Sequence, residues 1–189
     1  MRYFRIEADR NYTTSPQIIN WYQQLDNRDL KTGSYDKIPK RTLLRIQPNK
    51  NTIFLDVVSS PFFLISEMVK DCVSLYEPNL SYKEMILLDH KNNKMQPYFH
   101  PMLREVDCLS NNAVFNMDHS ELKMIELDEK RIEDKAIFRL AGVKKWYVIA
   151  RLDLLESLLR RGAVGLSIQE VSVRKGSVIC QEQEKKRNI

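Results

Sequence analysis

The strongest constraint on the fold is a strand–helix–strand pattern in residues 137–173. Apolar runs at residues 137–140 and 146–149 have the length of strands, and the residues between them, which begin at Gly142, suit a hairpin turn. Residues 151–161 place leucines on one side of a helix that Gly162 ends. Residues 166–173 then predict a further strand. The segment therefore predicts a core-building unit in which a helix packs on a sheet.

A fainter copy of this pattern lies at residues 61–103. Two aromatic residues, an aliphatic residue and an isoleucine occur at residues 62–65 and again at residues 146–149, and an amphipathic helix follows each run. Each helix leads into a Leu-Ser-x-x-Glu sequence, at residues 80–84 and 166–170. Because few residues match, chance similarity is the alternative. The expected fold class is α+β, with a mixed, largely antiparallel sheet and two strand–helix–strand units related by a weak internal repeat.

Local signals place the elements of the first copy. Ser66 suits the N-cap of a helix that ends near Pro78. The expected buried face of that helix consists of Met68, Val69, Cys72 and Leu75. Residues 80–88 and 95–103 predict a hairpin, and Pro97 and Pro101 place its second strand at an edge or interrupt it. Leu152, Leu155, Leu158 and Leu159 form the expected buried face of the later helix.

The remaining residues predict additional strands around these units. Residues 2–7, 41–46, 53–58 and 122–127 have strand patterns, and residues 128–135 predict a charged turn or a single helical turn. Ser15 and Pro16 predict the start of a helix that fades near residue 26. We divide the chain into an N-terminal segment (residues 1–60), a core with the two units (residues 61–180) and a disordered tail (residues 181–189), within one compact protein.

Composition narrows the class of protein. A chain of 189 residues with 43% hydrophobic residues can bury a core without metals or disulfides. Cys72, Cys108 and Cys180 are odd in number and far apart, as in reduced thiols of a cytoplasmic protein. The chain shows no signal peptide and no apolar run near the ~18 residues of a membrane span. We therefore expect a cytoplasmic protein without membrane contact.

No set of residues has the pattern of a catalytic or metal site. His90, His100 and His119 are too far apart for a compact metal site and are expected at the surface. Cys108 could act as a nucleophile only with a base and a lowered pKa, which the sequence does not show. Carboxylates in residues 121–134 alternate with basic residues, as on a solvated face. The sequence predicts no enzymatic activity, no metal and no cofactor.

The charge permits several kinds of partner. The formal net charge is +5 with a pI near 9.0, which suits an acidic partner or a nucleic acid, but basic residues near Tyr12 and Tyr35 are too scattered to favour nucleic acid. Aromatic residues on the first predicted helix suit a protein interface. The candidate partner-binding residues are Tyr12, Trp21, Tyr22, Arg28, Tyr35, Tyr98 and His100.

Residues 137–142, residues 146–150, the leucine-rich helix, and Gly165-Leu166 leading into residues 168–171 together resemble a bacterial protein family. That family was first catalogued as a domain of unknown function and later grouped with immunity proteins of polymorphic toxin systems. Residues 62–67 and 106–109 are similar to its upstream motifs, so the resemblance covers residues 61–173. Residues 1–60 resemble a version of the family found in Firmicutes.

The resemblance implies a non-enzymatic immunity protein that binds a cognate toxin and neutralises it by occluding its active site. It brings no catalytic residues. The basic charge of the chain argues for a neutral or acidic toxin and against a strongly basic nuclease. The alternative function is a small-ligand or nucleic-acid-binding regulatory domain. The sequence does not specify the oligomeric state.

Overall fold

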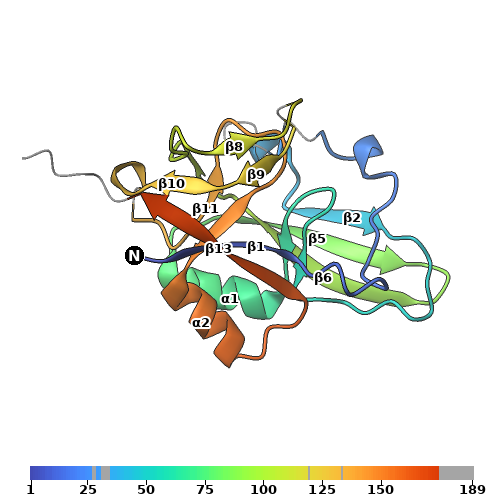
Figure 1. Cartoon of the computed structure of the whole chain (residues 1–189). Coiled ribbons are helices and arrows are strands. Elements are labelled where there is room, and N and C mark those ends of the chain that lie inside the picture. Colours follow the sequence, from blue (N-terminus) through green and yellow to red (C-terminus); the bar gives the residue numbers. More distant parts are fainter. Residues whose placement is uncertain (27–28, 31–34, 119, 133, 175–189) are drawn as a thin grey trace, which may run out of the picture.

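The structure is a computed structural model that describes residues 1–26, 29–30, 35–118, 120–132 and 134–174 (Figure 1). Over these residues the fold is mixed α/β and consists mostly of sheet. The six-stranded sheet contains, in order, β10 (Glu126–Asp128), β13 (Leu166–Arg174), β1 (Tyr3–Ala8), β12 (Val148–Arg151), β11 (Ile137–Leu140) and β7 (Glu105–Val106). The five-stranded sheet contains β2 (Arg41–Arg45), β5 (Tyr82–Asp89), β6 (Lys94–Pro101), β4 (Leu64–Ile65) and β3 (Val57–Val58).

The smaller elements complete the described fold. The remaining strands, β8 (Val114–Phe115) and β9 (Leu122–Met124), pair with each other. The helices are α1 (Glu67–Tyr76) and α2 (Leu152–Arg160), and the short 3-10 turns are η1 (Trp21–Gln23), η2 (Tyr35–Lys37) and η3 (Glu129–Arg131). Among the described residues, no helix is long and apolar enough to cross a membrane.

The strand–helix–strand segments occupy equivalent places in the two large sheets. β4 and β5 are both antiparallel to β6, which lies between them, and β12 and β13 are both antiparallel to β1. The strands on either side of each helix are therefore parallel to one another. Further out, β2 is parallel to β5 as β10 is to β13, and β3–β4 and β11–β12 are antiparallel pairs. Strand order and direction agree over five strands of each sheet, whereas a common origin of the units stays a prediction.

The sheet registers refine the predicted alignment of the units. Ser66 and Arg151 are the N-caps of α1 and α2, so the residues before them, Ile65 and Ala150, correspond. Ile65 on β4 pairs with Phe99 on β6, and Ala150 on β12 pairs with Phe4 on β1. In each sheet the partner is the strand that lies between the two parallel strands of the unit. The predicted match of residues 62–65 with residues 146–149 is thus one residue out of register.

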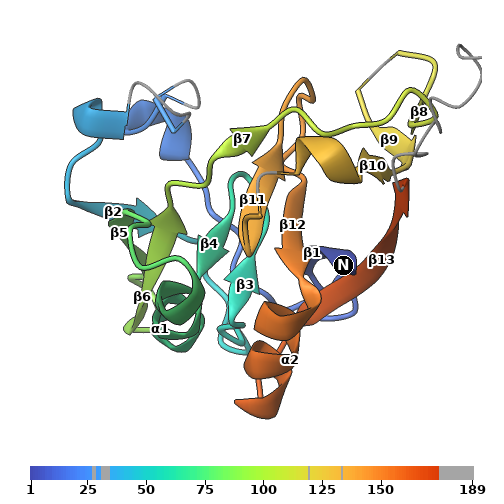
Figure 2. The same cartoon turned by 90° about the vertical axis from the view of Figure 1, so that its left-hand side faces the viewer.

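The two helices pack against each other beneath the sheets (Figure 2). The Tyr76 hydroxyl on α1 lies 2.5 Å from the Ser157 hydroxyl on α2 and donates to the Asp153 carbonyl at 3.1 Å. The central apolar core fills the space between the helices and both sheets, and it includes Ile6, Ile65, Val69, Ala150 and Leu154. The two sheets and two helices therefore share one core.

A second and a third apolar cluster cover the other faces of the sheets. The five-stranded sheet is covered around Leu44, Met85 and Tyr98 by apolar side chains of the N-terminal segment, namely Ile18, Trp21, Leu25, Leu30, Tyr35 and Ile38. Side chains from residues 106–127 pack on the six-stranded sheet around Phe138 and Tyr147. Each large sheet thus has apolar residues on both faces.

The prediction of each helix was correct in position but wrong in part of its buried face. On α1 the buried residues are Val69, Cys72 and Val73, and Leu75 is 70% exposed. Counted from Val69, the buried stripe i, i+3, i+4, i+7 continues at Tyr76, which packs against the core, and Leu75 lies beside it. On α2, Leu159 is 49% exposed whereas Leu154 is buried. Ser66 caps α1 as predicted, because its side chain accepts a hydrogen bond from the Val69 backbone N–H at 3.3 Å.

The helix predicted after Ser15 is absent, and only η1 forms within residues 16–26. Backbone pairing explains the difference. The Ile19 N–H donates to the Arg45 carbonyl at 2.9 Å, and the Gln47 N–H donates to the Gln17 carbonyl at 2.8 Å. This segment is therefore extended beside the end of β2, and its backbone groups are not available for helical hydrogen bonds.

Two predicted strands also differ from the structure, and one prediction lies outside the described residues. Only Val57–Val58 of the predicted strand at residues 53–58 forms a strand. β6 is the middle strand of its sheet rather than an edge, although it pairs with β4 only through Ile65 and Phe99. The predicted tail at residues 181–189 lies outside the described residues.

A half-buried carboxylate joins the two units. Asp56 accepts a hydrogen bond from the Ser66 hydroxyl at 2.6 Å and another from the Val164 backbone N–H at 2.7 Å. Its own backbone N–H donates to the Val164 carbonyl at 3.1 Å. Since Ser66 caps α1 and Val164 follows α2, one side chain fixes the start of one helix relative to the end of the other.

Replacing this carboxylate should destabilise the whole fold. We expect Asp56→Ala to lower the free energy of unfolding by about 1–3 kcal/mol, because it leaves polar groups at Ser66 and Val164 without their partner. Asp71→Ala, at an exposed position on α1, should change it by no more than about 0.5 kcal/mol. Urea denaturation followed by circular dichroism measures both values, and equal effects of the two substitutions would contradict this role for Asp56.

Candidate functional site

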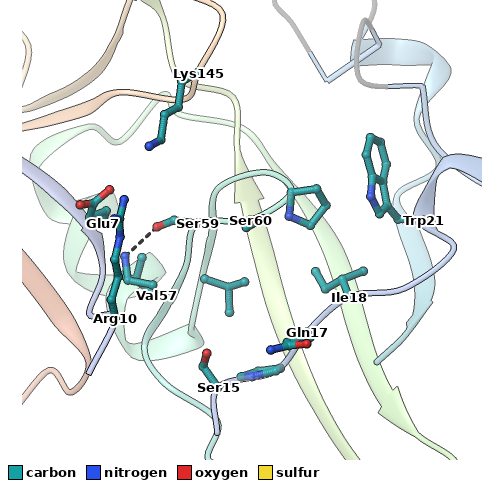
Figure 3. Close-up of a pocket in the computed structure, with 14 residues that line it drawn as sticks. Glu7, Arg10, Ser15, Gln17, Ile18, Trp21, Val57, Ser59, Ser60 and Lys145 are labelled. Carbon is teal, nitrogen blue, oxygen red and sulfur yellow. Dashed lines mark hydrogen bonds between the residues drawn. The ribbon is translucent and has the colours of Figure 1, made fainter. Parts of the chain in front are cut away.

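A cleft of about 540 Å³ opens where the N-terminal segment meets the two large sheets (Figure 3). Its walls come from four parts of the chain that the topology brings together: the end of β1 and the turn after it, residues 15–21, the β3–β4 connection, and the β11–β12 hairpin. The cleft therefore lies at the boundary between the two units. Its wall residues are Glu7, Ala8, Arg10, Ser15, Pro16, Gln17, Ile18, Trp21, Val57, Val58, Ser59, Ser60, Pro61 and Lys145.

One end of the cleft carries the large apolar side chains. Trp21 and Ile18 lie on this side, with the Gln17 amide next to Ile18 (Figure 3). The Trp21 ring packs edge-on against the buried Phe62 ring, with 5.7 Å between centroids and an interplanar angle of 82°. Because Phe62 belongs to the second apolar cluster, the core holds the indole in place while part of it remains exposed. The Tyr22 ring also packs edge-on against this indole, with 6.3 Å between the ring centroids.

The other end of the cleft is polar. The Ser59 hydroxyl accepts a hydrogen bond from the Ala8 backbone N–H at 2.7 Å, which fixes the β3–β4 connection to the end of β1. Arg10 and Lys145 extend toward this end, where Glu7 also lies (Figure 3). The polar end thus combines two cations, one carboxylate and a hydroxyl group.

The charges at this end leave an excess positive charge. Glu7 accepts a hydrogen bond from the Arg5 guanidinium at 2.5 Å, and the Lys145 amine donates to Glu121 at 3.0 Å. Arg10 is exposed and has no ion-pair or hydrogen-bond partner among the described residues. The hydrogen bond from Lys145, followed by the charges of Lys145, Arg10 and Arg5, lowers the pKa of Glu121. Glu7 and Glu121 are each paired with a cation, so the positive charge of Arg10 is in excess.

Three of the candidate partner-binding residues lie on the segment beside the cleft. Trp21 forms part of its wall, Tyr22 is 66% exposed, and Tyr12 is half-buried in the turn between Arg10 and Ser15. Arg28 lies outside the described residues. The structure therefore brings Tyr12, Trp21 and Tyr22 to one side of the molecule.

For the other three candidates the structure corrects the prediction, because Tyr35, Tyr98 and His100 are buried. The Tyr35 hydroxyl donates to the His100 carbonyl at 2.6 Å, and the Tyr98 hydroxyl donates to the Leu55 carbonyl at 2.5 Å. Burial raises the pKa of both tyrosines. Tyr35 and Tyr98 belong to the second apolar cluster, and all three side chains lie inside the protein rather than at its surface.

His100 is also not the surface histidine that the sequence predicts, although His90 is exposed as expected. Its Nδ1 lies 2.8 Å from the Phe63 carbonyl, and its ring makes edge-to-face contacts with Phe62 and Trp146. Burial lowers the pKa of His100, and the Phe63 and Leu30 carbonyls partly oppose this shift. The imidazole is therefore a neutral part of the core at pH 7.

The described residues do not form a thiol or metal centre of the kinds considered from the sequence. Cys108 is buried, and burial raises the pKa of its thiol to about 12, so the thiol is protonated at neutral pH. Asp107 forms an ion pair with Arg131 instead of activating the neighbouring thiol. No group of three His, Cys, Asp or Glu side chains among the described residues could hold a metal ion.

Ser59 and Lys145 were not identified from the sequence, and Arg10 was considered only among the scattered basic residues near Tyr12. Arg10 and Lys145 are separated by 135 positions in the chain. They come together because β1 pairs with β12, which follows the hairpin that carries Lys145. No local pattern signals that pairing, since each residue alone resembles an ordinary basic residue in a turn.

The buried imidazole predicts a loss of stability in mild acid. The unfolded histidine titrates near pH 6.5, whereas folding lowers the pKa of His100, so the unfolded state binds more protons as the pH falls. The free energy of unfolding should decrease below about pH 6.5, by at most about 1.4 kcal/mol per pH unit. Urea denaturation between pH 7 and pH 5 measures this slope. His100→Gln should reduce the slope and exposed His90→Gln should preserve it; an unchanged slope in His100→Gln would exclude His100 as the cause.

Comparison with known proteins does not narrow the interpretation of this cleft: no protein-family model matches the chain, and no curated protein matches it.

Proposed function

We propose that this protein is a non-enzymatic immunity protein, which binds a cognate bacterial toxin and neutralises it. The observation that carries the proposal is the composition of the cleft and its rim. Trp21, exposed Tyr22 and Arg10, which has no ion-pair partner among the described residues, lie at one site. Tryptophan, tyrosine and arginine are the residue types that contribute most to binding energy in protein interfaces. The sequence resemblance to immunity proteins supports the same function.

Rigid support of these residues favours tight binding. The Trp21 indole rests on buried Phe62, and the Ala8–Ser59 hydrogen bond fixes the opposite wall of the cleft. A surface that is already ordered loses less conformational entropy when a partner binds. The proposed interface therefore consists of the cleft with Tyr22 on its rim, and a toxin bound there is blocked by the body of the immunity protein.

Charge specifies the kind of toxin surface. The chain has a net charge of +5, and at the polar end of the cleft the Arg10 guanidinium pairs with no carboxylate in the described part of the chain. Complementary charges favour encounter and specificity, so the proposed toxin presents a neutral or acidic surface to the cleft. We place this interaction in the cytoplasm, in keeping with the free, buried thiols of Cys72 and Cys108.

A regulatory domain that binds a small ligand is the second candidate. The volume of the cleft, about 540 Å³, falls within the range of small-molecule sites, roughly 300–1,000 Å³. Binding of a small molecule with no binding of a toxin would favour this candidate. Binding of DNA or RNA that weakens steeply with salt would favour a nucleic-acid-binding regulator.

We also propose that the two strand–helix–strand units descend from one ancestral unit. The matching order and directions of five strands in each sheet support this proposal. A profile built from relatives of residues 64–89 should align with residues 149–174 so that Ile65 matches Ala150. Alignment in a different register would contradict a common origin.

Substitutions in the cleft should weaken binding of the toxin. The probe is the toxin domain encoded beside the gene for this chain, in an inactive form. We expect Trp21→Ala and Arg10→Glu each to raise the Kd by about 30-fold, since removal of a central interface residue costs about 2 kcal/mol or more. Isothermal titration calorimetry measures the Kd, and co-expression with the active toxin measures protection of cells.

Matched control variants separate binding from folding. Arg160→Glu changes the same charge at an 81% exposed side chain on α2, and it should bind the toxin like the unmodified protein. Thermal unfolding should show similar Tm values for Arg10→Glu and Arg160→Glu. If the unmodified protein neither binds this toxin domain nor protects cells, the immunity function is wrong. If all variants bind equally well, the cleft is not the interface.

A further inference from the structure

We infer that the cleft binds a carboxylate joined to an apolar group, with the carboxylate at Arg10 and the apolar group against Trp21. This inference rests on the proposed function, because it specifies what the same cleft recognises in a partner. It also applies to a free organic acid of the same chemistry. The cleft places the two kinds of side chain on opposite sides: Trp21 and Ile18 on one, and Arg10 and Lys145 on the other (Figure 3).

The polar end favours an anion over a cation. Glu7 is already neutralised by Arg5, so it does not offer a free carboxylate to a positively charged ligand. Arg10 has no ion-pair or hydrogen-bond partner in the described part of the chain. The Lys145–Glu121 pair is partly exposed, and such pairs are weak, so the amine is able to turn toward a second anion.

The anion most compatible with this end is a single carboxylate. A guanidinium donates two parallel hydrogen bonds to the two oxygens of a carboxylate, and the unpaired Arg10 is exposed to do so. Phosphate sites commonly add several backbone N–H groups, often from glycine-rich turns. Here the Ala8 N–H already donates to Ser59, and no glycine occurs among the wall residues of the cleft. The single excess positive charge of Arg10 therefore matches the single negative charge of a carboxylate.

The opposite end requires an apolar group. Trp21 and Ile18 line this side of the cleft, so a polar group placed against their side chains would lose hydrogen bonds to water (Figure 3). An aromatic or branched aliphatic group would instead pack on the indole face or edge. A partner protein supplies this chemistry as an Asp or Glu beside a large apolar residue, and a metabolite supplies it as an organic acid with an apolar body.

The test uses the full chain and two matched probes, 3-phenylpropionate and its neutral amide, 3-phenylpropanamide. Calorimetry and tryptophan fluorescence should both detect binding of the acid, with a Kd in the millimolar range expected for a fragment of this size. The amide should bind about tenfold more weakly, because it cannot form the charge-assisted pair with Arg10. Added NaCl should weaken binding of the acid and leave binding of the amide unchanged.

Variants assign the binding to the two ends of the cleft. Arg10→Gln should weaken binding of the acid about tenfold, whereas Arg160→Gln should not change it. Trp21→Phe should preserve binding by calorimetry but abolish the fluorescence change, which separates Trp21 from Trp146, the other tryptophan. No binding of the acid, equal binding of acid and amide, or full binding by Arg10→Gln would each overturn the inference.

Competition with the inactive toxin domain identifies the natural source of the carboxylate. If 3-phenylpropionate raises the apparent Kd of the toxin, the cleft takes an acidic and apolar segment of the toxin. If the acid binds but the toxin does not, the occupant is a free organic acid, and the immunity function fails while this inference stands. If the toxin binds through the cleft and the acid does not bind, the immunity function stands and this inference fails.

Discussion

The apolar core shared by two helices and two sheets is the constraint on which the rest of the structure depends. Each helix covers the sheet that its own flanking strands build, and each also packs against the other helix. Neither unit can bury its apolar face alone, because part of that face contacts the other unit. Asp56 fixes the relative position of the helices through Ser66 and Val164. The cleft at the boundary of the sheets takes its shape from this arrangement.

The local sequence pattern was sufficient to predict those elements whose structure is determined by neighbouring residues in the sequence. The strand–helix–strand units, the Ser66 cap and the hairpin turns have signals within a few residues, and the structure contains each of them. The helix predicted after Ser15 failed because its start signal competes with a distant strand. Ile19 and Gln17 pair with the end of β2, and burial of this segment over the five-stranded sheet favours the extended form. Tertiary packing overrode a local preference.

The candidate site was predicted only where a residue type alone indicates its role. Trp21 and Tyr22 were identified because large aromatic residues in a polar segment suit an interface, and they lie at the cleft and on its rim. Tyr98 and His100 belong to the same chemical class, but strand alternation turns both into the core. Lys145 was missed, and Arg10 was considered only for nucleic-acid binding, because their proximity depends on the pairing of β1 with β12, which no local signal specifies.

The position of β1 sets an order in which the chain can fold. Residues 3–8 leave the ribosome long before their neighbours in the sheet, at residues 148–151 and 166–174. The five-stranded sheet has all of its strands once residue 101 has emerged, whereas β1 has no partner strand in the six-stranded sheet until residues 148–174 emerge. Contacts between such distant segments form slowly. During translation β1 is therefore an unpaired strand next to a folding sheet, and chaperones have access to it until β12 and β13 emerge.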